Sequence, residues 1–163
     1  MTLSGCRNIN NSATFHEAGD NTLVVKVLII ENFKGLTEAQ IQQHRQLNTY
    51  MGKNMVRWLN KYGYRASLAQ SHKDYRSSAG EYLLTEKVLK YNPGNVGLRI
   101  GLGFGAGSAS LDVHYKFYCK NKKIILSDDH GVGSSRNWTY CAEKNNKDII
   151  ARIGNTLNKY MLR

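Results

Sequence analysis

The chain has 163 residues, of which 41% are hydrophobic and 21% charged, with a single proline. This length fits one compact domain, and the composition excludes a wholly disordered or collagen-like chain. Lys and Arg outnumber Asp and Glu by 23 to 12, so the formal net charge is +11. Such a charge favours anionic partners, and composition alone leaves nucleic acid, lipopolysaccharide phosphates and anionic lipid headgroups as alternatives.

The first residues contain a short motif that predicts a lipid anchor. Leu3-Ser4-Gly5-Cys6 resembles the bacterial lipobox, whose cysteine becomes the lipidated first residue of a mature lipoprotein. We therefore predict Cys6 as a lipidation site and residues 1–20 as a lipobox-like start followed by a polar tether. Such a motif needs an apolar signal segment before it, which would lie upstream of Met1. The apolar runs at 23–30 and 96–107 are too short or too interrupted to cross a bilayer.

The first half of the remaining chain, 21–163, alternates between strand and helix patterns. The β-branched run at 22–30 predicts a buried strand. Thr37 and Gln40 form a capping box, and apolar residues every three or four positions then predict a helix over 38–62, ended by Gly63. Further strands are expected at 64–70 and 81–91, with a loop between them and a turn at 92–95 after the second.

The second half predicts a hairpin and a closing helix. Residues 110–119 alternate strictly, which puts Leu111, Val113, Tyr115, Phe117 and Cys119 on one face of a strand. The short link at 120–122 predicts an antiparallel partner from 123 onward, ending irregularly over 131–140. Residues 146–161 form an amphipathic pattern. We expect an α+β fold, a two-layer sandwich with a mostly antiparallel sheet of about five strands and two helices on one face.

Basic residues gather in two places and predict an anion-contact surface. Four-residue spacing puts three of them on one ridge of the first helix, and the other three lie at the hairpin turn. The six predicted contact residues are Lys53, Arg57, Lys61, Lys120, Lys122 and Lys123. A solvated charged face without any partner is the alternative interpretation.

The glycine-rich run is interpreted as a contact loop. Gly101, Gly103, Gly105 and Gly107 alternate in a way that suggests nucleotide binding, but a strand pattern follows them instead of the required helix. We therefore predict a flexible or bulged approach to the next strand, with its backbone accessible to a partner. No P-loop is present either.

Cysteine and histidine spacing argues against metal or catalytic chemistry. No CxxC or HExxH pattern occurs, so we predict no metal site, no cofactor and no enzymatic activity. Cys119 and Cys141 form either a disulfide or two half-buried thiols. Asp128, Asp129 and His130 make the densest acid and histidine cluster, which we interpret as a solvated turn at a strand end.

The central segment resembles a known family. Residues 81–95, with the turn Pro93-Gly94-Asn95, and residues 98–113, with Phe104-Gly105-Ala106-Gly107, are similar to the domain of unknown function 4410, a family of bacterial lipoproteins. The resemblance covers about 22–162 and is most specific between 81 and 135. It implies an envelope protein with a lipidated cysteine before the domain and no catalytic residues. The order of elements is also loosely similar to the periplasmic domain of curli-secretion lipoproteins and to the TolB amino-terminal module.

These observations together predict a non-enzymatic cell-envelope lipoprotein of the outer membrane or periplasm. Its expected partners are the membrane, reached through the lipid anchor, and other envelope proteins or anionic envelope surfaces. The alternative is a basic, cytosolic nucleic-acid-binding module that begins at Met1.

Overall fold

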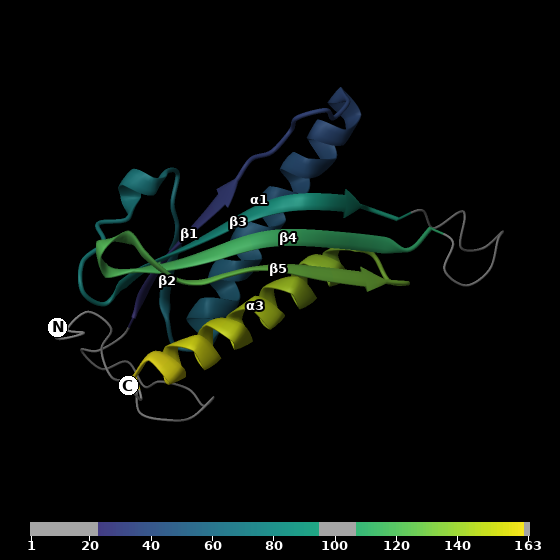
Figure 1. Cartoon of the computed structure of the whole chain (residues 1–163). Coiled ribbons are helices and arrows are strands. Elements are labelled where there is room, and N and C mark those ends of the chain that lie inside the picture. Colours follow the sequence, from purple (N-terminus) through teal and green to yellow (C-terminus); the bar gives the residue numbers. More distant parts are fainter. Residues whose placement is uncertain (1–22, 95–106, 162–163) are drawn as a thin grey trace.

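The computed structural model describes residues 23–94 and 107–161 (Figure 1). Short 3₁₀ turns also occur at His72–Asp74 and Lys120–Lys122. The main elements, in chain order, are β1 (Val24–Ile30), α1 (Glu38–Lys61), β2 (Arg65–Leu68), β3 (Glu81–Asn92), β4 (Ala109–Cys119), β5 (Lys123–Ser134) and α3 (Trp138–Met161). The fold is α+β, as the sequence predicts.

The five strands form one mixed sheet in the order β2-β1-β3-β4-β5. β1 pairs in parallel with both β2 and β3, whereas β3–β4 and β4–β5 are antiparallel. The predicted antiparallel pairing is present in β3–β4 and β4–β5, but the sheet is mixed because β1 is parallel to both of its neighbours. The physical reason is that α1 and the segment 69–80 each carry the chain back to the end of the sheet where β1 begins, and such crossovers produce parallel neighbours.

Both helices cover one face of the sheet, and the core between them and the sheet has two parts (Figure 1). In the first cluster, Val25, Leu84 and Phe117 pack against the second halves of α1 and α3. In the second, Val88 and Val113 pack against the first halves. The strict alternation of β4 produces this result, because its odd-numbered residues from Ala109 to Cys119 are all buried.

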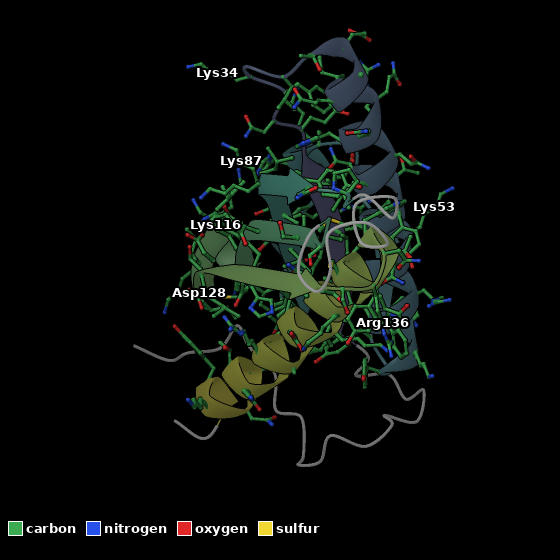
Figure 2. The ribbon with its side chains drawn as sticks, turned by 90° about the vertical axis from the view of Figure 1, so that its right-hand side faces the viewer. Lys34, Lys53, Lys87, Lys116, Asp128 and Arg136 are labelled. Carbon is green, nitrogen blue, oxygen red and sulfur yellow. The ribbon has the colours of Figure 1, made fainter. Side chains whose placement is uncertain are left out.

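The opposite face of the sheet has only a small apolar cover in the described part of the chain. Leu28, Leu83 and Ala69 pack there with Tyr75, whose hydroxyl donates a hydrogen bond to the Cys119 carbonyl. The rest of this face, which we call the open face, carries polar residues. Figure 2 shows Lys87 and Lys116 on the side of the molecule opposite Lys53, which projects from α1.

The sequence predicts the start of α1 correctly but places the start of α3 too late in the chain. The capping box of α1 is confirmed, with Thr37 Oγ1 accepting from Gln40 N and Gln40 Oε1 accepting from Thr37 N. α3 begins at Trp138, about two turns before the predicted start, because Asn137 Oδ1 accepts from the Tyr140 backbone and caps the helix. β5 correspondingly runs to Ser134.

The two buried cysteines lie at opposite ends of β4. Cys119 is the last residue of that strand, whereas Cys141 Sγ lies 3.6 Å from the carbonyl oxygen of Ala109, the first residue. A strand of this length separates its ends by about 30 Å, and a disulfide needs Cα atoms within about 7 Å. Of the two alternatives, a Cys119–Cys141 disulfide is therefore wrong, and both thiols are buried rather than half-buried.

Candidate functional site

At one end of the domain, several helices and strands begin or end close to Leu23, the first described residue. Arg65 N donates to the Leu23 carbonyl, so the start of β2 lies beside the start of β1. The end of α1 at Lys61 leads directly into this strand. Val24 pairs with Glu81 at the start of β3, and the β4–β5 turn follows on the same side of the sheet. We call this part of the molecule the Leu23 end.

The ends of both helices complete the Leu23 end. Leu59 of α1 and Leu157 of α3 pack in the same core cluster as Leu23 and Cys119. Lys123, at the start of β5, places its ammonium 5.5 Å from the ring centre of Tyr160 in the last turn of α3. Figure 1 shows the β4–β5 turn and the end of α3 on the same side of the molecule.

Cations surround the indole of Trp58, one turn before the end of α1. Lys147 of α3 and Lys61 place their ammonium groups 4.0 and 4.6 Å from the Trp58 ring centre, and the Arg57 guanidinium lies at 5.5 Å. The faces of an indole ring carry negative π charge and attract cations. The Trp58 ring can therefore keep three positively charged groups close to one another. The Tyr62 ring, 43% exposed, lies 6.0 Å from it. The result is a basic and aromatic patch that spans both helices.

Five of the six predicted contact residues share the Leu23 end. Arg57 and Lys61 belong to the Trp58 patch, and Lys120, Lys122 and Lys123 form the β4–β5 turn, where Lys120 is partly buried and the others are exposed. Lys53 is exposed too but lies two turns back along α1, about 12 Å from Lys61 along the helix axis. Sequence reasoning missed two further exposed cations at this end, Arg65 and Lys159.

Acidic groups offset little of this positive charge. Glu143 pairs with Lys147 beside Trp58, and backbone donors bind the carboxylates of Asp74 and Glu81. Asp74 accepts from the Gln70 and Ser71 amides, and the buried Glu81 accepts from the Arg76 amide. None of Arg57, Lys61 and the three turn lysines forms an ion pair within the described chain. The Leu23 end therefore presents excess positive charge to an anionic partner.

The predicted glycine contact loop lies almost wholly outside the described residues. Gly101, Gly103 and Gly105 belong to that part, and only Gly107 is described. Gly107 has φ of +73°, a conformation that suits glycine, and it lies two residues before the start of β4. Cys6 and the predicted tether also lie outside the described residues.

Asp128, Asp129 and His130 occupy the middle of β5 rather than a solvated turn. Because side chains alternate along a strand, Asp128 and His130 point toward α3 while Asp129 points to the open face. On the helix side, Arg152 Nη1 donates to Asp128 Oδ2 at 2.6 Å and to the Tyr115 hydroxyl at 3.2 Å. The turn interpretation is wrong because β4 supplies backbone partners along this whole segment.

The hydrogen bonds of His130 fix its tautomer. Arg152 Nη2 lies 3.2 Å from His130 Nδ1, and a guanidinium can only donate, so Nδ1 is the acceptor. Nε2–H then donates to Asp148 Oδ2 at 2.9 Å. Burial opposes ionisation of Asp148, but the hydrogen bonds from Lys144 and His130 hold the pKa of this carboxyl below its usual value. This network joins α3 to β5 and leaves neither histidine nitrogen available as a catalytic base.

A buried polar layer separates the two core clusters. Glu86 lies on the helix-covered face of β3 between Leu84 of the first cluster and Val88 of the second. It is 1% exposed, and neither carboxyl oxygen has a hydrogen-bond partner among the described residues. Burial raises the pKa of Glu86 to about 8, so the carboxyl is protonated at neutral pH. In the sequence, side chains on one face of this strand belong to residues 82, 84, 86 and 88. This alternation could have shown that Glu86 faces the core.

Four buried asparagines on the two helices belong to the same layer. Asn146 Nδ2 donates to the Met51 carbonyl at 3.0 Å and to Asn54 Oδ1 at 3.1 Å, and so links α3 to α1. Asn145 Nδ2 lies 3.4 Å from the His130 carbonyl. Asn48 is buried one turn before Met51. This layer fixes how the helices sit on the sheet.

Neither metal chemistry nor a membrane span finds support in the described residues. No group of three or more His, Cys, Asp and Glu side chains there has the geometry to hold a metal ion. None of the described helices has the length and apolar character needed to span a bilayer. The arrangement at the Leu23 end is suited to binding anions by charge.

No protein-family model matches the chain, and no curated protein sequence matches it. The resemblance to the domain-of-unknown-function family therefore stays a prediction. A neuraminyllactose-binding hemagglutinin homolog from Helicobacter pylori aligns over 94% of this chain and 95% of that one, at 13% identity and a TM-score of 0.40.

The PelC dodecamer from Paraburkholderia phytofirmans is more similar. A single-residue variant of PelC aligns over 88% of this chain and 95% of that chain, at 16% identity and a TM-score of 0.56. The PelC dodecamer in a second crystal form gives 0.55 at the same identity, over 88% of this chain and 93% of that one. At such low identity the likeness concerns the fold, and on that level this chain is similar to PelC.

Proposed function

We propose that this chain is a non-enzymatic lipoprotein of the cell envelope, anchored through Cys6, whose α+β domain acts in the periplasm as an accessory or assembly component. The observation that carries the proposal is the motif Leu3-Ser4-Gly5-Cys6, followed by the polar tether predicted over residues 7–20. An anchor, a spacer and a small domain in this order suit attachment to a membrane surface. The fold likeness to PelC supports the proposal.

The intact mass of the native protein tests the anchor. The protein is expressed from its natural locus with the upstream DNA, and membrane and soluble fractions are separated. We expect a membrane-bound species that begins at Cys6 and carries the added mass of acyl chains. A Cys6→Ser variant is expected in the soluble fraction at its unmodified mass. A soluble wild-type chain that retains Met1 or Thr2 would contradict the proposal.

Assembly with copies of itself is part of this proposal. The similar PelC structures are dodecamers, and in the described sheet β2 and β5 are the two edge strands. Backbone groups at an edge strand are available for contacts between copies. Light scattering on the purified chain at micromolar concentration is expected to give the mass of a ring of copies. A monomer mass at every concentration up to a millimolar would contradict the assembly.

The net charge of +11 supports a second candidate function, a cytosolic nucleic-acid-binding module. It predicts binding to duplex or single-stranded nucleic acid that weakens steeply with added salt. Fluorescence anisotropy with a labelled oligonucleotide at low salt measures this binding, and its absence would exclude this function.

A further inference from the structure

We propose that the Leu23 end is a docking face for anionic phospholipid headgroups, so that the domain lies with the end of α1 and the β4–β5 turn against the membrane. This inference rests on the proposed lipid anchor, because the anchor determines which membrane the domain faces. Its occupant is the phospholipid surface itself and not a protein partner. Three features support it.

The first feature is the position where the chain joins the domain. Residues 7–22 connect Cys6 to Leu23, and 16 residues span at most about 55 Å when fully extended. Leu23 lies beside Arg65, and Lys61 is four residues earlier in the chain. A lipid at Cys6 therefore holds the basic surface around Leu23 within reach of the headgroups. The opposite end of the domain, near Glu38 and Ala109, lies farther from Leu23, where the connecting segment joins the domain, by about the length of the strands.

The second feature is charge. The Leu23 end exposes basic side chains on α1, β2, α3 and the β4–β5 turn, whereas backbone amides donate to the carboxylates of Asp74 and Glu81. Each basic residue near an anionic membrane strengthens binding about fivefold. The exposed residues of this set are Arg57, Lys61, Arg65, Lys122, Lys123 and Lys159.

The third feature is the placement of aromatic rings among these cations. Tyr62 is 43% exposed just beyond the end of α1, and Tyr160 lies under Lys123 in the last turn of α3. Tyr and Trp favour the headgroup region because one part of each ring is apolar and another is polar. Aromatic rings together with basic groups at one end are the composition expected of a protein surface that lies on a bilayer.

The same ring contacts favour phospholipid over nucleic acid. Binding of single strands relies on bases that stack on open aromatic faces. Three cations already lie over the Trp58 ring, the nearest at 4.0 Å. This ring is therefore poorly available to a base, while the cations beside it remain available to phosphate groups.

Vesicle binding by the full chain without its lipid tests the docking face. The Cys6→Ser chain is mixed with phosphatidylcholine vesicles that contain either no phosphatidylglycerol or about one third of it. We expect binding only to the anionic vesicles, with a loss on addition of salt. Lys61→Gln, Lys122→Gln and Lys123→Gln together are expected to weaken binding about a hundredfold.

The matched control removes three lysines from other places. Lys34→Gln, Lys87→Gln and Lys116→Gln together change the net charge equally, and Figure 2 shows these residues along the side opposite Lys53. This control is expected to bind within about threefold of the parent chain. Equal losses in both triple variants would overturn the docking face, as would tighter binding to an oligonucleotide than to the anionic vesicles. Because the lipid is absent, none of these outcomes depends on the anchor, which the intact mass tests separately.

The two tryptophans give a second measurement, free of charge changes. The chain has two, Trp58 near the Leu23 end and Trp138 at the start of α3, near the other end. In a Trp138→Phe chain, spin-labelled headgroups are expected to quench Trp58 on vesicle binding. In a Trp58→Phe chain, Trp138 is expected to stay unquenched. Stronger quenching of Trp138 would reverse the orientation and overturn the inference.

Discussion

Each face of the sheet carries an Asp–His pair with one member on β5, but the two pairs have different surroundings. On the helix-covered face, His130 bonds to Asp148 at 2.9 Å and shares Arg152 with Asp128. On the open face, His114 lies 2.5 Å from Asp129, whose side chain is 68% exposed. One pair belongs to a network that joins three elements, whereas the other bridges two neighbouring strands in water.

This difference shows that burial determines how much a polar group contributes to the stability of the fold. Water competes for exposed charges and weakens their attraction, so an exposed ion pair contributes little to stability. A buried group that lacks a partner destabilises the fold unless it becomes neutral. Glu86 is the clearest case of such a buried group on the helix-covered face. Substitutions on the two faces are compared below, from the largest expected effect on stability to the smallest.

Phe117→Ala and Lys116→Ala should show the largest difference in stability between the two faces. The Phe117 ring is fully buried and stacks on Tyr82, with 5.1 Å between ring centres. Its removal leaves a cavity, so we expect a loss of about 3–5 kcal/mol in the free energy of unfolding. Lys116→Ala, one residue earlier and on the open face, should cost less than about 0.5 kcal/mol. Urea titrations of both variants measure the difference, and equal losses would contradict the assignment of the faces.

Glu86 should make stability depend on pH. Its pKa is about 8 in the folded chain and near 4.5 when unfolded, so the folded state holds this proton more tightly. Stability from this group is therefore complete below about pH 4.5 and is lost as pH rises through about 8. The expected fall in unfolding free energy over this window is a few kcal/mol.

Glu86→Gln isolates this contribution. The amide has nearly the same shape as the protonated carboxyl but does not ionise, so the variant should lose most of the pH dependence between 4.5 and 8. Above pH 8 it should be more stable than the wild-type chain. Urea titrations at several pH values test this, with Glu38→Gln on the exposed first turn of α1 as the control. An unchanged pH profile in Glu86→Gln would show that the carboxyl reaches water or a partner.

These contrasts also explain how much the sequence could predict. The buried face of β4 and the capping box of α1 follow from local patterns within about ten residues, and both are confirmed. The parallel pairing of β1 depends on where a crossover returns the chain, which no local pattern contains. Asp128 and His130 look like turn residues beside Gly131, but their pairing with β4 makes them part of a strand.

The candidate surface was predictable only in part for the same reason. Basic residues four apart on one helix and a cluster of lysines in a turn can be read directly. That the two groups lie at one end, together with Arg65 and Lys159, depends on both helices ending beside the start of β1. Lys147 reaches Trp58 from a helix about ninety positions later, so no spacing in the sequence indicates this contact.

Arg152→Met should give an intermediate effect. The substitution keeps much of the aliphatic length and removes the hydrogen bonds to Asp128, Tyr115 and His130. Its side chain is 39% exposed, so solvent reduces the contribution of these bonds, and we expect a loss of about 1 kcal/mol. Urea titration checks the value. Imidazole NMR should also show a shift of the His130 Nδ1 signal, which loses its donor, while the Nε2–H bond to Asp148 is kept and His114 is unaffected.

Asp129→Asn should have the smallest effect, although its partner distance is the shortest of the ion pairs. His114 and Asp129 face each other across β4 and β5 on the open face, where solvent screens their attraction. We expect a change below about 0.5 kcal/mol in the free energy of unfolding, measured by urea titration at pH 7. Asp128→Asn, one residue earlier, should cost more because Asp128 receives the Arg152 guanidinium. If the open-face variant proved the more destabilising of the two, contact distance rather than the packing of α3 on β5 would determine which of these two aspartates contributes more to stability.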